Sequence, residues 1–185
     1  FSPRTGTADA LSIMTEWKQT RSFSGLRERL ARIRAAEYVA ETTAMLTQDY
    51  DPHAALYDAL TATLTKLTDA GDDAALAEVV AYQRNLLVAT GLLPRFDVCV
   101  LCESAGPLPY FSAFEGGMLC RACEAGQAEK RAVSAATLNV LRGGDAAREA
   151  LGAFDILDYH LAHAAGREPT TAAALVPPQR RRSLH

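Results

Sequence analysis

The sequence predicts a mainly α protein: a helical bundle with an inserted zinc-ribbon-like module of four cysteines and a short strand near its N-terminal end. Three observations favour this fold class. Two Cys-x-x-Cys motifs stand seventeen residues apart in the middle of the chain. Segments on both sides of them repeat apolar residues with a helical period. Residues 10 to 20 alternate apolar and polar side chains instead, which is typical of a strand.

The two cysteine motifs predict a structural metal site. Cys99 and Cys102 form one motif, and Cys120 and Cys123 form the other. Each tight motif can aim two sulfur atoms at a common point, so that four thiolates surround one Zn²⁺ ion. Since no ligand position is left for water, the ion would be structural. A pair of reversible dithiols or disulfides is the alternative, but the spacing and the lack of a spare cysteine favour zinc.

The segment between the two motifs predicts a β-hairpin. Leu108 to Ser112 is rich in aromatic, β-favouring residues, and Gly116-Gly117 suits a turn that brings the second motif back to the first. The predicted zinc module covers residues 95–128.

Helical segments precede and follow this module. The first is expected from a capping Ser24 to about Thr47, with an apolar face that also carries Glu37, which would need a partner there. The others are expected at about 51–68, 73–90, 134–142 and 146–164, and short loops favour antiparallel neighbours. The apolar face of the first helix is predicted to consist of Leu26, Leu30, Ile33, Ala40 and Ala44.

The predicted domain boundaries follow from these elements. Residues 1–21 form an N-terminal strand region, residues 22–165 a helical domain that contains the zinc module, and residues 166–185 a flexible tail. A lone strand is unstable, so it should join a sheet absent from this sequence or lie along the helical body. His160 and His163 are three residues apart, but without a nearby third ligand they are interpreted as ordinary surface or boundary residues.

The formal net charge of −3 conceals a basic run between Lys18 and Arg34, where six basic residues stand against Glu28 alone. This run predicts either a ridge for nucleic-acid phosphates or a solvated helix face. Arg95 and Arg121 can extend such a ridge beside the cysteines. The arginines at 180–182 can touch an anion or remain solvated. The candidate DNA contacts are Lys18, Arg21, Arg27, Arg29, Arg32, Arg34, Arg95 and Arg121.

No known catalytic motif accompanies the cysteines. The chain lacks a P-loop, a Gly-x-Ser-x-Gly elbow and a His-Glu-x-x-His helix. Asp155 and Asp158 are expected on an exposed helical face, without an acid–base role. Because the closed metal site is the one strong motif, we expect a binding protein and not an enzyme. The sequence also has no apolar run long enough to span a bilayer and no signal-peptide pattern, which favours the cytoplasm.

Several stretches together resemble a known family. They are Leu11 to Trp17, Ser22 to Arg27, Gly91 to Pro94, Tyr110-Phe111-Ser112, Gly116 to Cys120 and Tyr159-His160-Leu161. In this order, around paired cysteines inside a helical domain, they resemble the bacterial RecO family of recombination mediators and DNA repair proteins.

The resemblance implies an N-terminal OB-fold, of which residues 1 to about 20 resemble only the last portion. It also implies binding to single- and double-stranded DNA, strand annealing, and partnership with RecR and single-stranded DNA-binding protein in loading RecA, at the bacterial nucleoid. Because most of the OB-fold is missing, independent single-strand binding is in doubt. The alternative function is a zinc-stabilised helical adaptor that binds only proteins.

Overall fold

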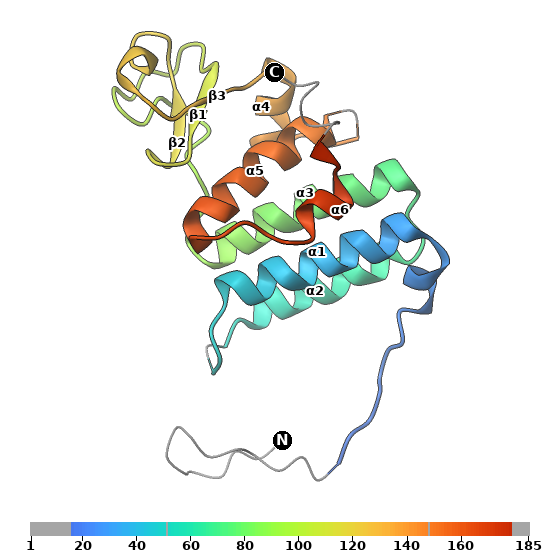
Figure 1. Cartoon of the computed structure of the whole chain (residues 1–185). Helices are drawn as coiled ribbons and strands as arrows, with labels where there is room; N and C mark the ends of the chain where they lie inside the picture. The colour runs from blue at the N-terminus through green and yellow to red at the C-terminus, as the bar shows by residue number, and fades with distance from the viewer. Residues whose placement is uncertain (1–15, 51, 148, 179–185) are drawn as a thin grey trace.

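The helical body is organised around α3 (Asp72–Ala89), which packs against α1 (Leu30–Leu46), α2 (Ala54–Leu67) and α5 (Ala150–Ala165) (Figure 1). The structure is a computed structural model that describes residues 16–50, 52–147 and 149–178. Figure 1 shows α1, α2 and α3 alternating in direction, as their short connections predict. The predicted fold class, a mainly helical protein with a small cysteine-bearing β module, is confirmed.

The first predicted helix is divided in two. Ser24–Glu28 forms the 3-10 turn η1, and α1 begins only after Arg29, whose backbone is extended. Ser24 therefore does not cap α1 as predicted. Phe23 precedes η1 with a left-handed φ of 45°, so the chain turns sharply where it meets the bundle.

The apolar face predicted for α1 is also wrong. Leu30 is exposed and Glu37 faces solvent, whereas Tyr38 is completely buried. Tyr38 packs against Phe154 of α5 with ring centroids 5.1 Å apart, and its hydroxyl donates to Asp158 Oδ1 at 2.8 Å. These contacts set the rotation of α1, because burying one large tyrosine with satisfied hydrogen bonds outweighs burying small alanines. The side chains of α1 that are buried are Arg32, Ala35, Tyr38, Val39 and Thr42.

The predictions for the next two helices agree with the structure. Their predicted starts differ by a few residues at most, although Asp51 lies outside the described residues. In α2, Leu56 and Leu67 are buried, while Leu60 and Leu64 are only partly covered. α2 is thus an edge helix that is buried along one side.

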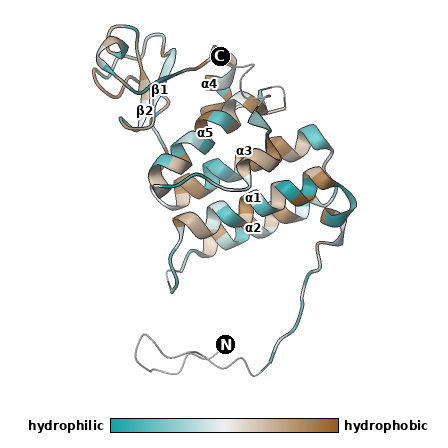
Figure 2. Ribbon diagram, in the orientation of Figure 1, coloured by the Kyte–Doolittle hydropathy of each residue, from teal (hydrophilic) through white to brown (hydrophobic). Residues whose placement is uncertain are grey.

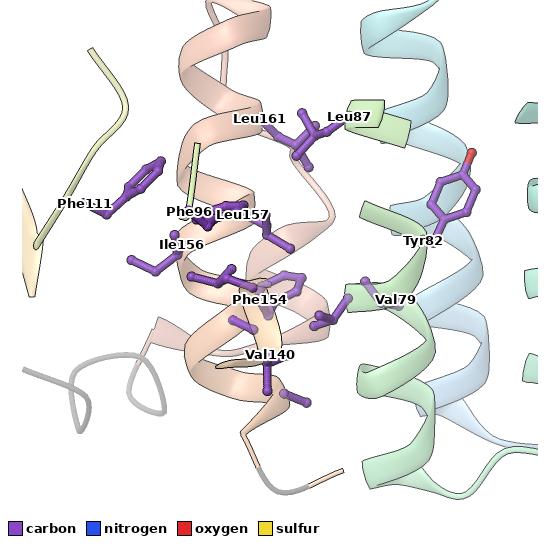
Figure 3. Packing of buried hydrophobic residues seen from close by; sticks show 14 of the residues in the cluster. Val79, Tyr82, Leu87, Phe96, Phe111, Val140, Phe154, Ile156, Leu157 and Leu161 are labelled. Atoms are coloured by element: carbon purple, nitrogen blue, oxygen red, sulfur yellow. The ribbon is translucent and has the colours of Figure 1, made fainter. Parts of the chain in front are cut away.

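The core continues from α3 through α5 to the β module. Figure 3 shows Val79 and Leu87 of α3 facing Phe154 and Leu161 of α5. Phe96 and Phe111 approach α5 from the opposite side, with their rings stacked 6.1 Å apart. Figure 2 shows hydrophobic and hydrophilic residues interleaved along the bundle helices, as expected for helices that bury one side.

The predicted hairpin is present. β1 (Tyr110–Ser112) pairs antiparallel with β2 (Gly117–Leu119), with Phe111 opposite Met118. A third strand that was not predicted, β3 (Arg131–Ala132), pairs with the other edge of β1. The short helix η2 (Glu124–Gly126) precedes β3. We call residues 95–132 the cysteine module, which Figure 1 shows in yellow beside α5.

A flexible tail was predicted at residues 166–185, but the described part of it, residues 166–178, includes a short helix that packs on the bundle. α4 (Ala135–Leu141) precedes α5, and after α5 the chain forms α6 (Ala172–Leu175), which packs on α1. Ala172 and Val176 are buried. The Glu41 carboxylate of α1 accepts hydrogen bonds from the backbone and hydroxyl groups of both Thr170 and Thr171, at 2.6 to 2.9 Å.

Most residues of the predicted N-terminal strand lie outside the described residues. Residues 16–20, which are described, form no strand. Arg180 to Arg182 also lie outside the described residues. Among the helices of the described residues, none combines the length and apolar character needed to cross a bilayer.

Candidate metal centre and nucleic-acid interface

The four predicted metal ligands lie together. The sulfur atoms of Cys99, Cys102, Cys120 and Cys123 are all within 4.8 Å of one another, and those of Cys102 and Cys120 are 3.7 Å apart. A tetrahedral ion with metal–sulfur bonds of about 2.3 Å requires sulfur separations of about 3.8 Å. The arrangement therefore fits one tetrahedral ion, and the four cysteines can hold a metal.

The pKa shifts of the clustered cysteines also favour a bound cation. Burial raises the pKa of Cys99, but backbone hydrogen bonds at Cys120, Cys102 and Leu101 outweigh this effect and lower it to about 6. The neighbouring Cys102 and Cys120 side chains raise the pKa of Cys123 to about 12. The neighbouring thiols thus favour the protonated form of Cys123, and a divalent cation would offset the repulsion between thiolates.

The backbone of the hairpin holds the two cysteine pairs in register. Arg95 donates its N–H to the Gly116 carbonyl and accepts from Met118 N–H, while Val100 N–H donates to the Met118 carbonyl. A Cβ atom on Gly117 would lie 2.7 Å from Arg95 O and 2.4 Å from Val100 Cγ1. Glycine at this position therefore permits the close approach of the first cysteine loop to β2.

A partly buried polar cluster joins the module to α5. Glu129 accepts hydrogen bonds from the Ser112 hydroxyl at 2.8 Å, the Phe114 N–H at 3.2 Å and the Tyr159 hydroxyl. Burial and Glu129 raise the pKa of Tyr159 to about 12. The hydroxyl therefore remains a donor over the whole physiological pH range.

Arg131 of β3 forms a second connection with α5. Its guanidinium donates to Asp155 at 2.8 Å and lies over the Tyr159 ring, 3.7 Å from the centroid. Asp155 and Asp158 are both buried, which corrects the predicted exposed face. The two aspartates face Arg131 and Tyr38, respectively, and so help to assemble the fold.

His160 connects α5 to the segment that leads into the module. Its Nε2 lies 2.9 Å from the Leu92 carbonyl, which can only accept, so Nε2 carries the proton. Its ring meets Phe111 edge-on. Burial lowers the pKa of His160, which favours the neutral ring. The module is thereby held by α5 at several points.

The candidate DNA-contacting residues are spread over the surface instead of forming one compact ridge. Lys18 and Arg21 are exposed on the extended segment, and Arg27 is exposed on η1. Arg29 lies 3.8 Å from Asp72, and Arg34 lines a cavity with Asp72 and Asp73. Arg121 is exposed beside the cysteines, and Arg95 lies near Asp97 and Glu103, at 3.8 and 3.9 Å.

Arg32 differs from the other arginines. It is only 8% exposed, and its guanidinium donates to Ala70 O at 2.8 Å, Gly25 O at 3.0 Å and Glu28 Oε2 at 3.3 Å. The side chain joins η1 and α1 to the loop before α3. Its burial and these partners leave it unsuited to contact DNA, contrary to the prediction.

Comparison with known sequences identifies the family. The model described as "Recombination protein O C terminal" matches residues 27–166. The chain belongs to the RecO family. A DNA repair protein RecO of Anaeromyxobacter sp. (strain K) is 37% identical over 162 residues, covering 76% of this chain and 62% of the relative. The RecO of Myxococcus xanthus is 36% identical, with coverages of 78% and 62%.

The chain therefore spans about three-fifths of the length of these RecO relatives. A RecO of Pelotomaculum thermopropionicum is 34% identical over 134 residues, covering 71% of this chain and 51% of the relative. No solved structure matches the chain.

Three of the stretches that resembled RecO in the sequence, Gly91 to Pro94, Tyr110 to Ser112 and Tyr159 to Leu161, meet at one place in the structure. Leu92 contacts His160, Phe111 packs on the same ring, and Ser112 reaches Tyr159 through Glu129. Glu129 and Arg131 were not predicted as site residues, because their partners lie 15 to 30 residues away and no local pattern signals the pairing.

Proposed function

We propose that this RecO-family chain acts in DNA repair as a non-catalytic DNA-binding recombination mediator, stabilised by one structural Zn²⁺ ion at Cys99, Cys102, Cys120 and Cys123. The observation that carries the proposal is family membership over most of the helical domain, together with exposed cationic side chains at its N-terminal end. The resemblance adds RecR and single-stranded DNA-binding protein as partners, with RecA acting downstream.

The phosphate contacts are assigned to Lys18, Arg21, Arg27, Arg29 and Arg34, with Arg95 and Arg121 as an extension on the cysteine module. Their flexible cationic side chains can neutralise backbone phosphates without reading bases. Arg32 is left out, because its guanidinium is already bound inside the fold. Zinc would keep the hairpin in register, since so short a β element has little core of its own.

Salt titration tests this function. Affinity for a DNA duplex should fall with a log–log slope of about −0.9 for each neutralised phosphate, so three contacts give about a 40-fold loss over a fourfold rise in salt. The double substitution Arg27→Ala and Arg34→Ala should reduce the slope by about 2. The matched variant with lysine at both positions retains the charges and should bind nearly as the wild type does.

A protein-only adaptor is the second candidate, favoured by the formal net charge of −3 and by the exposed apolar side chains Leu101 and Phe114 on the module. Absence of DNA binding even at low salt would support it and would exclude DNA contact by this chain. Metal analysis tests the zinc assignment separately, with one ion per chain as the expected result.

A further inference from the structure

A groove of about 600 Å³ lies between the N-terminal segment and α2. One side is formed by Thr20, Arg21 and Phe23, and the other by the outer face of α2, where Tyr57 is 68% exposed. The partly covered Leu60 and Leu64 also line it. This is the surface of α2 that the bundle leaves uncovered.

The wall that carries Phe23 is fixed with respect to α2. The Phe23 carbonyl accepts a 3.1 Å hydrogen bond from Leu26 N–H. Gly25 lies against the end of α2, so closely that a Cβ atom on it would be 2.6 Å from Thr68 O. Arg32 holds the Gly25 carbonyl from the other side. The part of the groove around Phe23 is therefore preformed.

The chemistry of the groove suits a ligand that is both flat and anionic. Phe23 and Tyr57 contribute aromatic rings to the lining, and the exposed Arg21 has no side-chain partner among the described residues. Upstream, Trp17 is 71% exposed and is followed by the exposed Lys18, so aromatic and basic residues continue along the segment. Asp58 is the acidic residue in the lining, and it would direct phosphates toward Arg21.

We infer that this groove binds unpaired nucleotides of single-stranded DNA, with Tyr57 and Phe23 stacking on bases and Arg21 contacting the backbone. Unpaired bases expose the faces that such stacking needs, whereas bases within a duplex are already stacked on one another. The inference rests on the proposed DNA-binding function. It adds a single-strand site that is separate from the arginines of η1 and α1.

Substitution of Tyr57 tests the inference. The full chain is titrated against a fluorescently labelled oligothymidine and, separately, against a duplex of the same length. Loss of one stacked base costs about 1 to 3 kcal/mol, so Tyr57→Ala should weaken oligothymidine binding about 5- to 150-fold. Duplex affinity should remain unchanged. Arg21→Ala should reduce the salt slope for the single strand by about 0.7.

Two matched variants serve as controls. Tyr57→Phe keeps the ring and should bind oligothymidine as the wild type does. Tyr50 is also highly exposed but lies outside the groove, so Tyr50→Ala should have little effect. Because Trp17 is the single tryptophan of the chain, quenching of its fluorescence provides an independent measure of base contact near the groove.

The outcomes separate this site from the general DNA-binding function. If the wild type binds both DNA forms and Tyr57→Ala binds oligothymidine equally well, the groove does not stack bases and the proposed function stands. An equal loss for single strand and duplex would also overturn the inference. If the wild type binds neither form at low salt, both the site and the proposed function are wrong.

Discussion

Arg32 and its neighbours in the basic run have the same charge but different surroundings. Arg27 is exposed, whereas Arg32 is buried with three oxygen acceptors. A buried carbonyl that loses its donor costs about 1 to 3 kcal/mol. The role of each arginine is therefore decided by its partners and not by its position in a charged segment.

Arg32→Ala should lower the free energy of unfolding by about 2 to 4 kcal/mol, since it orphans the carbonyls of Gly25 and Ala70. Denaturant titration measures this loss. Arg27→Ala is the matched control and should change stability by less than about 0.5 kcal/mol. If Arg32→Ala left stability unchanged but weakened DNA binding, Arg32 would be a contact residue after all.

Glu41 makes stability depend on pH. Its burial alone would raise its pKa, but hydrogen bonds from Thr171 and Thr170 lower it from 4.5 to about 2. A carboxyl group whose pKa is lower in the folded state stabilises the fold above its unfolded pKa. This contribution is fully present above about pH 5 and is lost as the pH falls from 4.5 toward 2.

Glu41→Gln should therefore destabilise the protein by about 1 to 3 kcal/mol at neutral pH, with the difference from wild type shrinking as the pH falls below 4.5. Denaturation at several pH values measures it. Glu37→Gln, at an exposed position on the same helix, controls for the change of charge. If the stability difference between the two proteins did not change with pH, the stabilisation would not depend on the charge of the Glu41 carboxylate.

Among individual residues, the sequence allowed the four cysteines to be recognised because their spacing is a local pattern. It could not distinguish Arg32 from Arg27, because the carbonyl of Ala70 that holds Arg32 is 38 residues away. Asp155 was similarly misjudged, since its partner Arg131 lies on an unpredicted strand.

At the scale of elements, the junction between the cysteine module and α5 depends on polar contacts as well as packing. Tyr159 donates to Glu129, which also holds Ser112 of β1. Because these groups are partly buried, removing one donor leaves the Glu129 carboxylate with fewer hydrogen bonds to offset the cost of its burial.

Tyr159→Phe should weaken this junction by about 1 to 3 kcal/mol while keeping the ring that packs on Arg131. Hydrogen exchange should become faster in β1 and β2, with little change in α2 and α3. Tyr57→Phe, at an exposed position on α2, is the control. Unchanged exchange in the strands would mean that apolar packing alone docks the module.

Helical periodicity located α2 and α3 well but gave the wrong buried face for α1. The reason is that Tyr38, which was not counted as a core residue, forms buried contacts with both Phe154 and Asp158. The helix α6 was missed because it is short and is held by Glu41, 129 residues from Thr170. Both errors arise from distant contacts, which propensity does not encode.

For the whole molecule, metal removal should affect the module more than the bundle. We expect a strong chelator to release one zinc ion per chain and to expose residues 98–124 to rapid hydrogen exchange. Far-UV circular dichroism should retain most of its helical signal, because α1, α2, α3 and α5 share a core built from apolar side chains. If chelation unfolded the whole chain, the stability of the bundle would also depend on the metal, contrary to this prediction.

A variant with all four cysteines replaced by serine is the control for nonspecific effects of the chelator. It should bind no zinc, should show fast exchange in the module from the start, and should not respond to chelation. A zinc-dependent rise in the melting temperature should be seen only in the wild type.

The packing of α6 on α1 also brings the two ends of the helical body together, since Leu30 and Pro177 line the same cavity. A short flexible linker between these ends would leave the bundle intact, and new termini could be opened at Gly143-Gly144. Circular permutation of the domain is thus geometrically allowed.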